Sequence, residues 1–416
     1  MQLAAHIKIC ITMLDTFIVS GAPFDIIMAK FFKNHRVGSH DRRAVAELAY
    51  SIFRNFEKIR FFSSNITSNW GRIYVLIFLR VCYALPENEI DDIFSGKPFH
   101  PPKLTEFEKR ILSSINKGND FHENVILNYP ELMTPFFKRA FQQDTFANEI
   151  SALNGKAFVD LRVNTLKSTR EEVKQILKNS GFELEDCRYS PCGLRLLKGR
   201  IGRNHEVLAN GLAEIQDEGS QLIAEACAVS PGDVVVDYCS GAGGKALALA
   251  AIMKNKGRIF ALDKYEERLA NAKIRFRKAN VNNVFCQPIS KKWIKRHRES
   301  ADVVLVDAPC SGVGTWRRNP DMRAKFTISG LEELLNVQAE ILESAFQLVK
   351  KSGKLIYATC SVLMEENEDQ IVKFLANHTE FIRQRVNLSN YSGDYLKLTP
   401  FQHKTDGFFA AVLRKN

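Results

Sequence analysis

The chain has 416 residues, of which 45% are hydrophobic, and a formal net charge of +11 from 58 Lys and Arg against 47 Asp and Glu. This length is enough for two or three packed domains, and the composition is that of a globular protein. No apolar run approaches the roughly 20 residues that span a bilayer; residues 73–79, for example, form a run of seven. We therefore expect a globular protein that acts without a membrane.

The nine cysteines are an odd number and include no Cys-x-x-Cys pair. This pattern argues against a disulfide framework and against a zinc ribbon, and no other metal-ligand set is evident. We expect a cytoplasmic protein with free thiols and no bound metal.

The N-terminal third is expected to be helical. Residues 1–22 faintly resemble a signal peptide, but Asp15 interrupts the apolar part, and apolar residues at helical spacing favour an amphipathic helix. Similar stripes continue to about residue 128, with a proline-rich loop at 95–109. A small α/β module is expected over 129–208, with a strand at 157–167 and a helix that Thr169 or Ser168 caps and Gly181 ends.

From residue 209 to 416, strands and helices alternate. Strands are expected at 233–241, 257–263, 283–289, 302–310, 353–361 and 407–415, and helices at 245–255, 264–280, 331–350 and 365–378. This order predicts a Rossmann-like α/β domain with a mostly parallel sheet covered on both sides, and ligands bind such sheets at the carboxyl ends of the strands. The residues of chemical interest fall at these ends: Asp237, Cys239, Asp263, Asp307, Cys310 and Cys360.

A basic stretch covers residues 264–298, with eleven Lys or Arg against two Glu. It is either a solvated surface or a site that follows the phosphates of a nucleic acid, whose binding would then depend on salt.

A glycine-rich turn, DYCSGAGGKA at 237–246, joins the first strand of the sheet to a helix. A phosphate loop is excluded because Cys239 replaces its first glycine and Ala246 its Ser or Thr. A dinucleotide site fits the GxGxxA pattern, with Asp263 at the end of the next strand for a ribose. A site for S-adenosylmethionine would use the same acidic residue, Asp263, to bind the ribose hydroxyls. The third alternative is a turn whose glycines serve packing alone.

Two thiols decide between these ligands. Cys310 and Cys360 each follow an apolar strand at the same edge of the sheet. Hydride transfer needs no thiol there, whereas methylation of cytosine carbon 5 needs a thiolate to add to carbon 6 and a base to remove the carbon 5 proton. Asp307, three residues before Cys310, is placed to supply a proton to the ring nitrogen.

The same residues carry a resemblance to a known family. DAPCSGVGTWRRNPDMR, GKLIYATCSVLMEENEDQI, DYCSGAGGK, DLRVNTLK and HKTDGFFAAVLRK resemble motifs of the RsmB/NOP2/Sun RNA cytosine-5 methyltransferases. The resemblance covers residues 129–416, and residues 1–128 are similar to the NusB-like RNA-binding domain of the bacterial members. It implies S-adenosylmethionine as cofactor, ribosomal RNA more than tRNA as substrate, and a monomer.

The resemblance also implies roles for individual residues. Cys360 is the nucleophile, Cys310 assists release of the product, and Lys245 is an active-site lysine or neutralises Asp307. Arg162 and Asn164 lie near the RNA or form a structural turn. The implied cofactor contacts are Cys239, Ser240, Gly241, Ala242, Gly243, Gly244, Lys245, Asp263 and Asp307.

The sequence departs from the family at two places. The turn lacks the usual proline and the hydroxyl residue after Lys245, and the third strand lacks the aspartate for the adenine, leaving Gln287 as a substitute. The predicted function is an RNA cytosine-5 methyltransferase. The alternatives are a tRNA enzyme of the same chemistry, an inactive RNA-binding or ribosome-assembly factor of the same fold, and a dehydrogenase.

Overall fold

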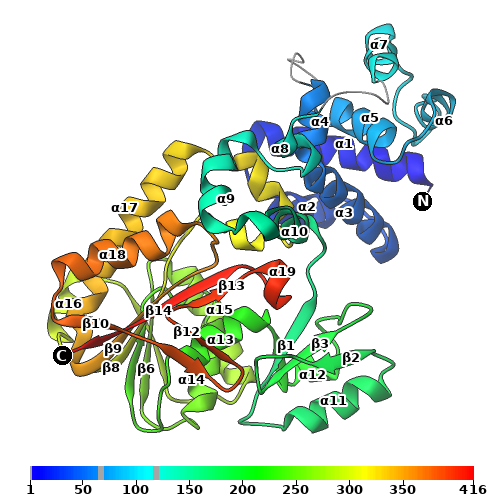
Figure 1. Ribbon diagram of the computed structural model, residues 1–416. Helices are drawn as coiled ribbons and strands as arrows, with labels where there is room; N and C mark the ends of the chain where they lie inside the picture. Colours follow the sequence, from blue (N-terminus) through cyan, green and yellow to red (C-terminus); the bar gives the residue numbers. More distant parts are fainter. Residues whose placement is uncertain (1, 64–69, 116–120) are drawn as a thin grey trace. The chain divides into compact units, whose positions relative to one another are not determined.

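The computed structural model describes residues 2–63, 70–115 and 121–416 (Figure 1). It separates into two compact units: residues 1–155 together with 316–327, and residues 156–315 together with 328–416. The division into parts at 128 and 208 stays a prediction.

The first unit is helical, as expected. An apolar core formed mainly by α1, α3 and α5 holds it together. Its helices are α1 (Leu3–Ser20), α2 (Phe24–Asn34), α3 (Ser39–Arg54), α4 (Phe56–Ser63), α5 (Trp70–Val81), α6 (Glu87–Ile93), α7 (Glu106–Ser114), α8 (Glu123–Ile126), α9 (Thr134–Ala140) and α10 (Phe146–Asn154).

Helix α1 is the one helix of the described residues that is long and apolar enough to cross a membrane by length and composition, with a mean hydropathy of 1.5. A core helix passes the same test. Ile7, Cys10, Leu14 and Phe17 of α1 are buried in the core of the helical unit, so the predicted amphipathic helix is confirmed.

The segment 316–327 comes from the middle of the second unit's sequence but belongs to the helical unit. The Asp321 carboxylate accepts a hydrogen bond from the Phe24 amide at 3.1 Å. Buried Arg323 donates to the carbonyl oxygens of Arg54 and Asn128. The sequence alone assigned this segment to the methyltransferase part, because it directly follows the Cys310 motif.

The second unit begins with a four-stranded antiparallel sheet in the order β2-β3-β1-β4. Its elements are β1 (Val159–Val163), α11 (Arg170–Asn179), β2 (Leu184–Asp186), β3 (Gly193–Leu196), α12 (Glu206–Ala209) and β4 (Ala213–Ile215). Thr169 caps α11 with Glu172 in a capping box, as the sequence predicts. Gly181, just past this helix, has a φ of +81°.

The large sheet has the order β10-β14-β9-β8-β5-β6-β7, with β13 also paired to β14. Strands β9, β8, β5, β6 and β7 are parallel, and β14 and β10 are antiparallel. The elements are α13 (Glu218–Ala226), β5 (Val234–Asp237), α14 (Gly244–Ile252), β6 (Arg258–Asp263), α15 (Glu266–Lys278), β7 (Val284–Pro288), α16 (Lys291–Arg296), β8 (Ala301–Asp307), α17 (Ile328–Ala345), β9 (Val349–Thr359), α18 (Glu368–Asn377), β10 (Phe381–Gln384), β11 (Val386–Leu388), β12 (Tyr391–Gly393), β13 (Leu396–Leu398), α19 (Pro400–His403) and β14 (Phe408–Lys415).

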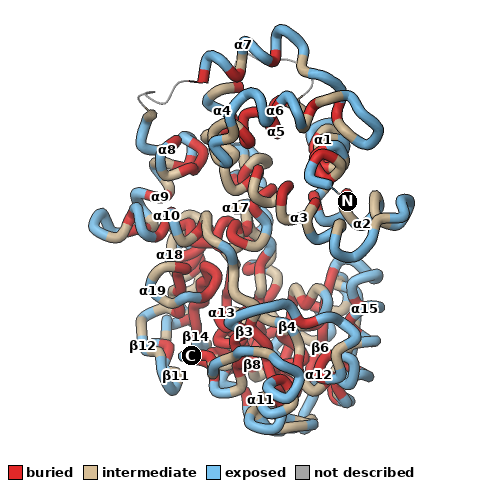
Figure 2. The backbone as a smooth tube through the Cα atoms, turned by 90° about the vertical axis from the view of Figure 1, so that its right-hand side faces the viewer, coloured by how far each residue is buried: buried red, intermediate tan, exposed pale blue. Residues whose placement is uncertain are grey.

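Successive strand residues face opposite sides of this sheet, where helices cover them. On β5, Val235 packs with α13 and α14, whereas Val236 packs on the side of α17 and α18. Both faces are apolar, which explains the nearly continuous hydrophobic runs in the sequence. Figure 2 shows the strands of this sheet largely buried. The predicted Rossmann-like fold with a mainly parallel sheet is confirmed.

Candidate active site

The site residues predicted from sequence lie at one edge of the large sheet. Because β9, β8, β5 and β6 are parallel neighbours, their carboxyl ends meet at this edge. Asp237, Asp263 and Asp307 are the last residues of β5, β6 and β8, and Cys360 directly follows β9. The fold therefore brings together residues that are up to 123 positions apart in the sequence.

The glycine turn leads from β5 into α14. Gly241 and Gly243 have φ angles of +55° and +78°, which favour glycine over residues with a side chain. A Cβ at Gly243 would lie 2.6 Å from the Phe276 ring, whereas the Cβ position at Gly241 has no atom within 4 Å. One glycine is thus required for packing, and the other leaves open space where a ligand can approach the backbone.

Asp263 holds the turn in place. Its carboxylate accepts hydrogen bonds from the amides of Gly241 at 2.9 Å and Tyr265 at 2.8 Å, and the residue is 4% exposed. Each carboxylate oxygen has two lone pairs, so both oxygens retain capacity for ribose hydroxyls. Gln287, expected as a substitute for the missing aspartate, is exposed near the end of β7, where it pairs with Leu262 in the ladder.

Lys245 points from α14 to the end of β8. Its Nζ lies 2.6 Å from Asp307 Oδ2, with the Lys245 side chain buried and the Asp307 side chain 31% exposed. Burial alone would lower the pKa of Lys245, but the adjacent Asp307 carboxylate outweighs burial and raises it. Lys245 is therefore a cation at neutral pH, and its protons lie next to the Asp307 carboxylate.

The two thiols are neighbours. Cys310 Sγ lies 3.4 Å from Cys360 Sγ, and neither residue is in a disulfide. Interaction with Cys360 and burial together raise the pKa of Cys310 well above the usual thiol value. Cys310 is thus protonated at neutral pH.

Other residues of the site were missed by sequence reasoning. Glu366 and Asn367 lie just after Cys360 and contact the backbone around both thiols. The sequence suggested only that the acidic residues 365–369 begin a helix. Asp237, in contrast, was identified from sequence; it is fully buried, and burial raises its pKa to about 7, while nearby Ser240 opposes that shift.

Arg162 and Asn164 have structural contacts. Arg162 is buried, and its Nε donates to Gln216 Oε1 at 2.6 Å. The Asn164 amide donates to the carbonyl oxygens of Gly211 and Ala279 at 3.0 and 2.9 Å. Asn164 thereby links the small sheet to the end of α15, which agrees with a structural turn.

The basic stretch 264–298 is divided between two faces of the large sheet. Ala272 and Phe276 of α15 pack in the core on one face, and Ile294 of α16 packs in the core on the other. Trp293 stacks on His297, with ring centroids 4.0 Å apart. The exposed cations therefore form two surfaces.

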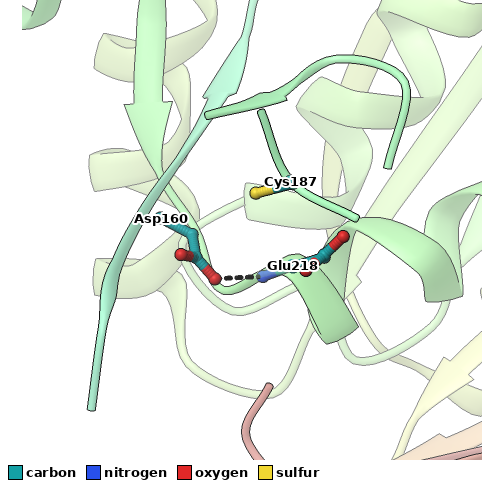
Figure 3. Close-up of side chains that lie close together, drawn as sticks. All are labelled: Asp160, Cys187 and Glu218. Carbon is teal, nitrogen blue, oxygen red and sulfur yellow. Dashed lines mark hydrogen bonds between the residues drawn. The ribbon is translucent and has the colours of Figure 1, made fainter. Parts of the chain in front are cut away.

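One group of side chains in the described residues could in principle hold a metal: Asp160, Cys187 and Glu218 (Figure 3). The Arg195 guanidinium already binds both Asp160 oxygens, at 2.7 and 2.9 Å, and lies 3.3 Å from Glu218 Oε2. This cation compensates the buried carboxylates, so the group is a structural ion network.

Comparison with known proteins identifies the family. Residues 224–414 match the model of the 16S rRNA methyltransferases RsmB/F, and residues 129–201 match the ferredoxin-like domain of the same proteins. The ribosomal RNA small subunit methyltransferase B of Photorhabdus laumondii is 30% identical over 320 residues, which cover 75% of this chain and 72% of that protein. The chain belongs to the RsmB/F methyltransferase family.

Two further relatives extend the similarity to the whole chain. The ribosomal RNA small subunit methyltransferase B of Vibrio cholerae is 24% identical over 409 residues, or 91% of each chain. The crystal structure of PH0851 superposes with a TM-score of 0.81 at 26% identity and covers 100% of this chain and 99% of its own.

Membership of the RsmB/F family confirms the predicted cofactor, S-adenosylmethionine, and sets aside the dinucleotide alternative. The residues of the site fit this cofactor. The turn at Gly241 is open, and the Asp263 carboxylate at the end of the second strand has free acceptor capacity.

Proposed function

We propose that this RsmB/F methyltransferase transfers a methyl group to carbon 5 of a cytosine in small-subunit ribosomal RNA through a covalent Cys360 adduct. One observation carries the proposal: two thiols lie 3.4 Å apart at the sheet edge that also holds the Lys245–Asp307 pair. An inactive RNA-binding factor would have no need of this arrangement.

Cys360 makes the first bond. We assign the attack to Cys360, whose thiolate sulfur bonds to carbon 6 while the electrons of the C5–C6 double bond move into the ring. Asp307 delivers a proton, shared with Lys245, to the ring nitrogen and neutralises the charge that develops there.

Bound S-adenosylmethionine supplies an electrophilic methyl group, which carbon 5 takes while the sulfonium sulfur keeps the electrons of the broken bond. Asp263 and the turn from Cys239 to Lys245 would hold this cofactor. The cytosine must leave any base stack to reach the thiols.

Cys310 then releases the product. Once Cys360 is bonded to carbon 6, its interaction with the Cys310 thiol, which raises the pKa of Cys310 together with burial, is lost. Cys310 then gives its own proton to a water and, as a thiolate, removes the carbon 5 proton, directly or through a second water. The electrons of that bond restore the double bond, Cys360 leaves as a thiolate, and the ring nitrogen returns its proton to the Asp307–Lys245 pair.

The test compares two alanine variants after turnover with RNA. On a denaturing gel, Cys360→Ala should run as free protein, whereas Cys310→Ala should be shifted by attached RNA. Cys286→Ala, which changes a partly buried thiol on β7, is the matched control and should behave as the unchanged protein. Full activity of both variants without any adduct would refute the covalent mechanism, and the opposite gel pattern would exchange the two roles.

Bisulfite sequencing of ribosomal RNA and tRNA from cells with and without the gene distinguishes the two substrate classes. We also propose that the protein acts in the cytoplasm and that it is a monomer. Light scattering on the purified chain tests the oligomeric state.

A further inference from the structure

The buried carboxylate of Glu366 connects the two thiol motifs. Glu366 follows Cys360 by six positions and is 0% exposed, yet its side chain reaches the loop that carries Cys310. Oε1 accepts a hydrogen bond from the Ser311 amide at 2.7 Å, and Oε2 accepts from the Ser311 hydroxyl at 2.6 Å. Hydrogen bonds to a carboxylate are stronger than neutral ones, so this contact fixes the residue that follows Cys310.

The residue before Cys310 is held by the same network. Gln338 is fully buried on α17, and its Nε2 donates to Glu366 Oε1 at 3.0 Å and to the carbonyl oxygen of Pro309 at 3.0 Å. The backbone is therefore anchored on both sides of Cys310, through Pro309 and Ser311. Gln370 in turn supports Gln338 from α18.

Asn367 holds Cys360 in a corresponding way. Its Oδ1 accepts from the Thr359 hydroxyl at 2.5 Å, and its Nδ2 donates to the Ser361 carbonyl oxygen at 3.0 Å. Thr359 and Ser361 flank Cys360, and all three polar residues are nearly fully buried. The backbone between Glu366 and Asn367 is itself held in place, because the Tyr357 hydroxyl donates a hydrogen bond to the Glu366 carbonyl oxygen at 2.7 Å.

We propose that Glu366 and Asn367 are positioning residues that hold the two thiols at the separation the reaction needs. Glu366 fixes Cys310 for product release, and Asn367 fixes Cys360 for attack. The division of labour rests on the proposed covalent mechanism, whereas the fixed separation of the thiols does not. Adjacent residues of one chain set both loops, so a change in either one moves one thiol relative to the other.

The two residues should give different defects. Glu366→Gln replaces the charge-assisted hydrogen bonds to Ser311 and Gln338 by weaker neutral ones, and one side-chain atom that accepts in Glu366 becomes a donor, so the Cys310 loop should shift while Cys360 keeps its contacts. A displacement of about 1 Å typically costs about 100-fold in rate. We expect kcat to fall by about that factor, KM for RNA to stay within about threefold, and the fraction of protein trapped on RNA to rise. Asn367→Ala should lower kcat similarly but trap less protein than the unchanged chain does.

A second measurement needs no RNA. Diamide accepts two electrons and two protons from a pair of nearby thiols and leaves a disulfide. The rate at which Cys310 and Cys360 pair, followed by peptide mapping, should fall in both variants. Ser311→Ala removes only one donor to Glu366 and should show the Glu366→Gln defects at smaller size, even if Glu366→Gln does not fold.

Asp302→Asn is the matched control. It removes a carboxylate that also accepts a backbone hydrogen bond, at the opposite end of β8. Its thiol pairing and trapping should be those of the unchanged protein. If Glu366→Gln, Asn367→Ala and Ser311→Ala also leave thiol pairing and trapping unchanged, the two residues are merely structural and the proposal is overturned. If Cys310 and Cys360 form the disulfide more slowly in the variants, but no RNA adduct appears even in Cys310→Ala, the positioning role is supported and only the covalent mechanism is refuted.

Discussion

Asp263→Ala separates the cofactor role of the sheet edge from its structural role. The substitution removes the acceptor of two backbone hydrogen bonds, from Gly241 and Tyr265, and the group expected to bind the ribose hydroxyls. A hydrogen bond to a charged group contributes about 1.5–3 kcal/mol. We expect S-adenosylmethionine to bind roughly 10- to 150-fold more weakly, and the free energy of unfolding to fall by about 3–6 kcal/mol because the turn loses both contacts.

The assay is calorimetric titration of the folded protein with S-adenosylmethionine, beside RNA binding measured at one salt concentration. RNA affinity should change by less than about threefold, well under 1 kcal/mol, because Asp263 is 4% exposed and faces the turn. Asp302→Ala is the control, since that carboxylate accepts the Val234 amide and pairs with Lys350 at the far end of the parallel strands. It should lower stability without weakening cofactor binding. Equal loss of cofactor affinity in both variants, or equal loss of cofactor and RNA binding in Asp263→Ala, would refute the assignment.

Three further predictions concern charge. Reversing the charge of the four exposed cations of α16 should weaken RNA binding and flatten its dependence on salt; these are Lys291, Lys292, Lys295 and Arg296. Reversing Lys273 and Arg277 of α15 tests the surface on the other face of the sheet. An unchanged salt dependence in both variants would show that neither surface has a role in RNA binding. Burial raises the pKa of Asp237 to about 7. The folded protein thus retains a proton that the unfolded chain loses near pH 4, and the free energy of unfolding should fall as pH rises from about 4 to 7. Asp237→Asn should remove up to roughly 4 kcal/mol of that fall in urea titrations at several pH values, and an unaltered slope would contradict the assignment. Arg195→Met should lower the free energy of unfolding by about 3–5 kcal/mol, because it leaves two buried carboxylates without their cation, and a change below about 1 kcal/mol would show that the network adds little.

The grouping of the site residues at the carboxyl ends of the parallel strands could be predicted from sequence, because it follows from local sequence patterns. The strands that carry the site, β5, β6, β8 and β9, are apolar runs that stop at an acidic residue or just before a thiol, as at Asp263 and Cys360. Parallel pairing then places all the stops at one edge, whichever strands are neighbours. The same logic located the glycine turn, whose pattern reflects backbone angles at Gly241 and Gly243 that few other residues adopt.

The basic stretch shows where such reasoning ends. Its eleven cations lie within one stretch of the sequence, but the chain passes through β7 between α15 and α16 and so changes from one face of the sheet to the other. A count of charges along the chain does not include that crossing. Likewise, nothing local marks residues 316–327 as part of the helical unit, because the partners of Asp321 and Arg323 lie roughly 200 to 300 positions away.

The network around the thiols was hidden for a related reason. Glu366 and Ser311 are 55 positions apart, and in sequence Glu366 is one of several acids before a helix. Its burial distinguishes it from those neighbours, and burial follows from the loops that close over it once β8 and β9 pair. A buried carboxylate with three donors is costly to assemble and costly to disturb, which suits a residue that must keep two loops in one arrangement. The reactive pair is therefore defined by sequence at Cys310 and Cys360, but the separation of 3.4 Å between their sulfur atoms depends on residues that only the fold brings to them.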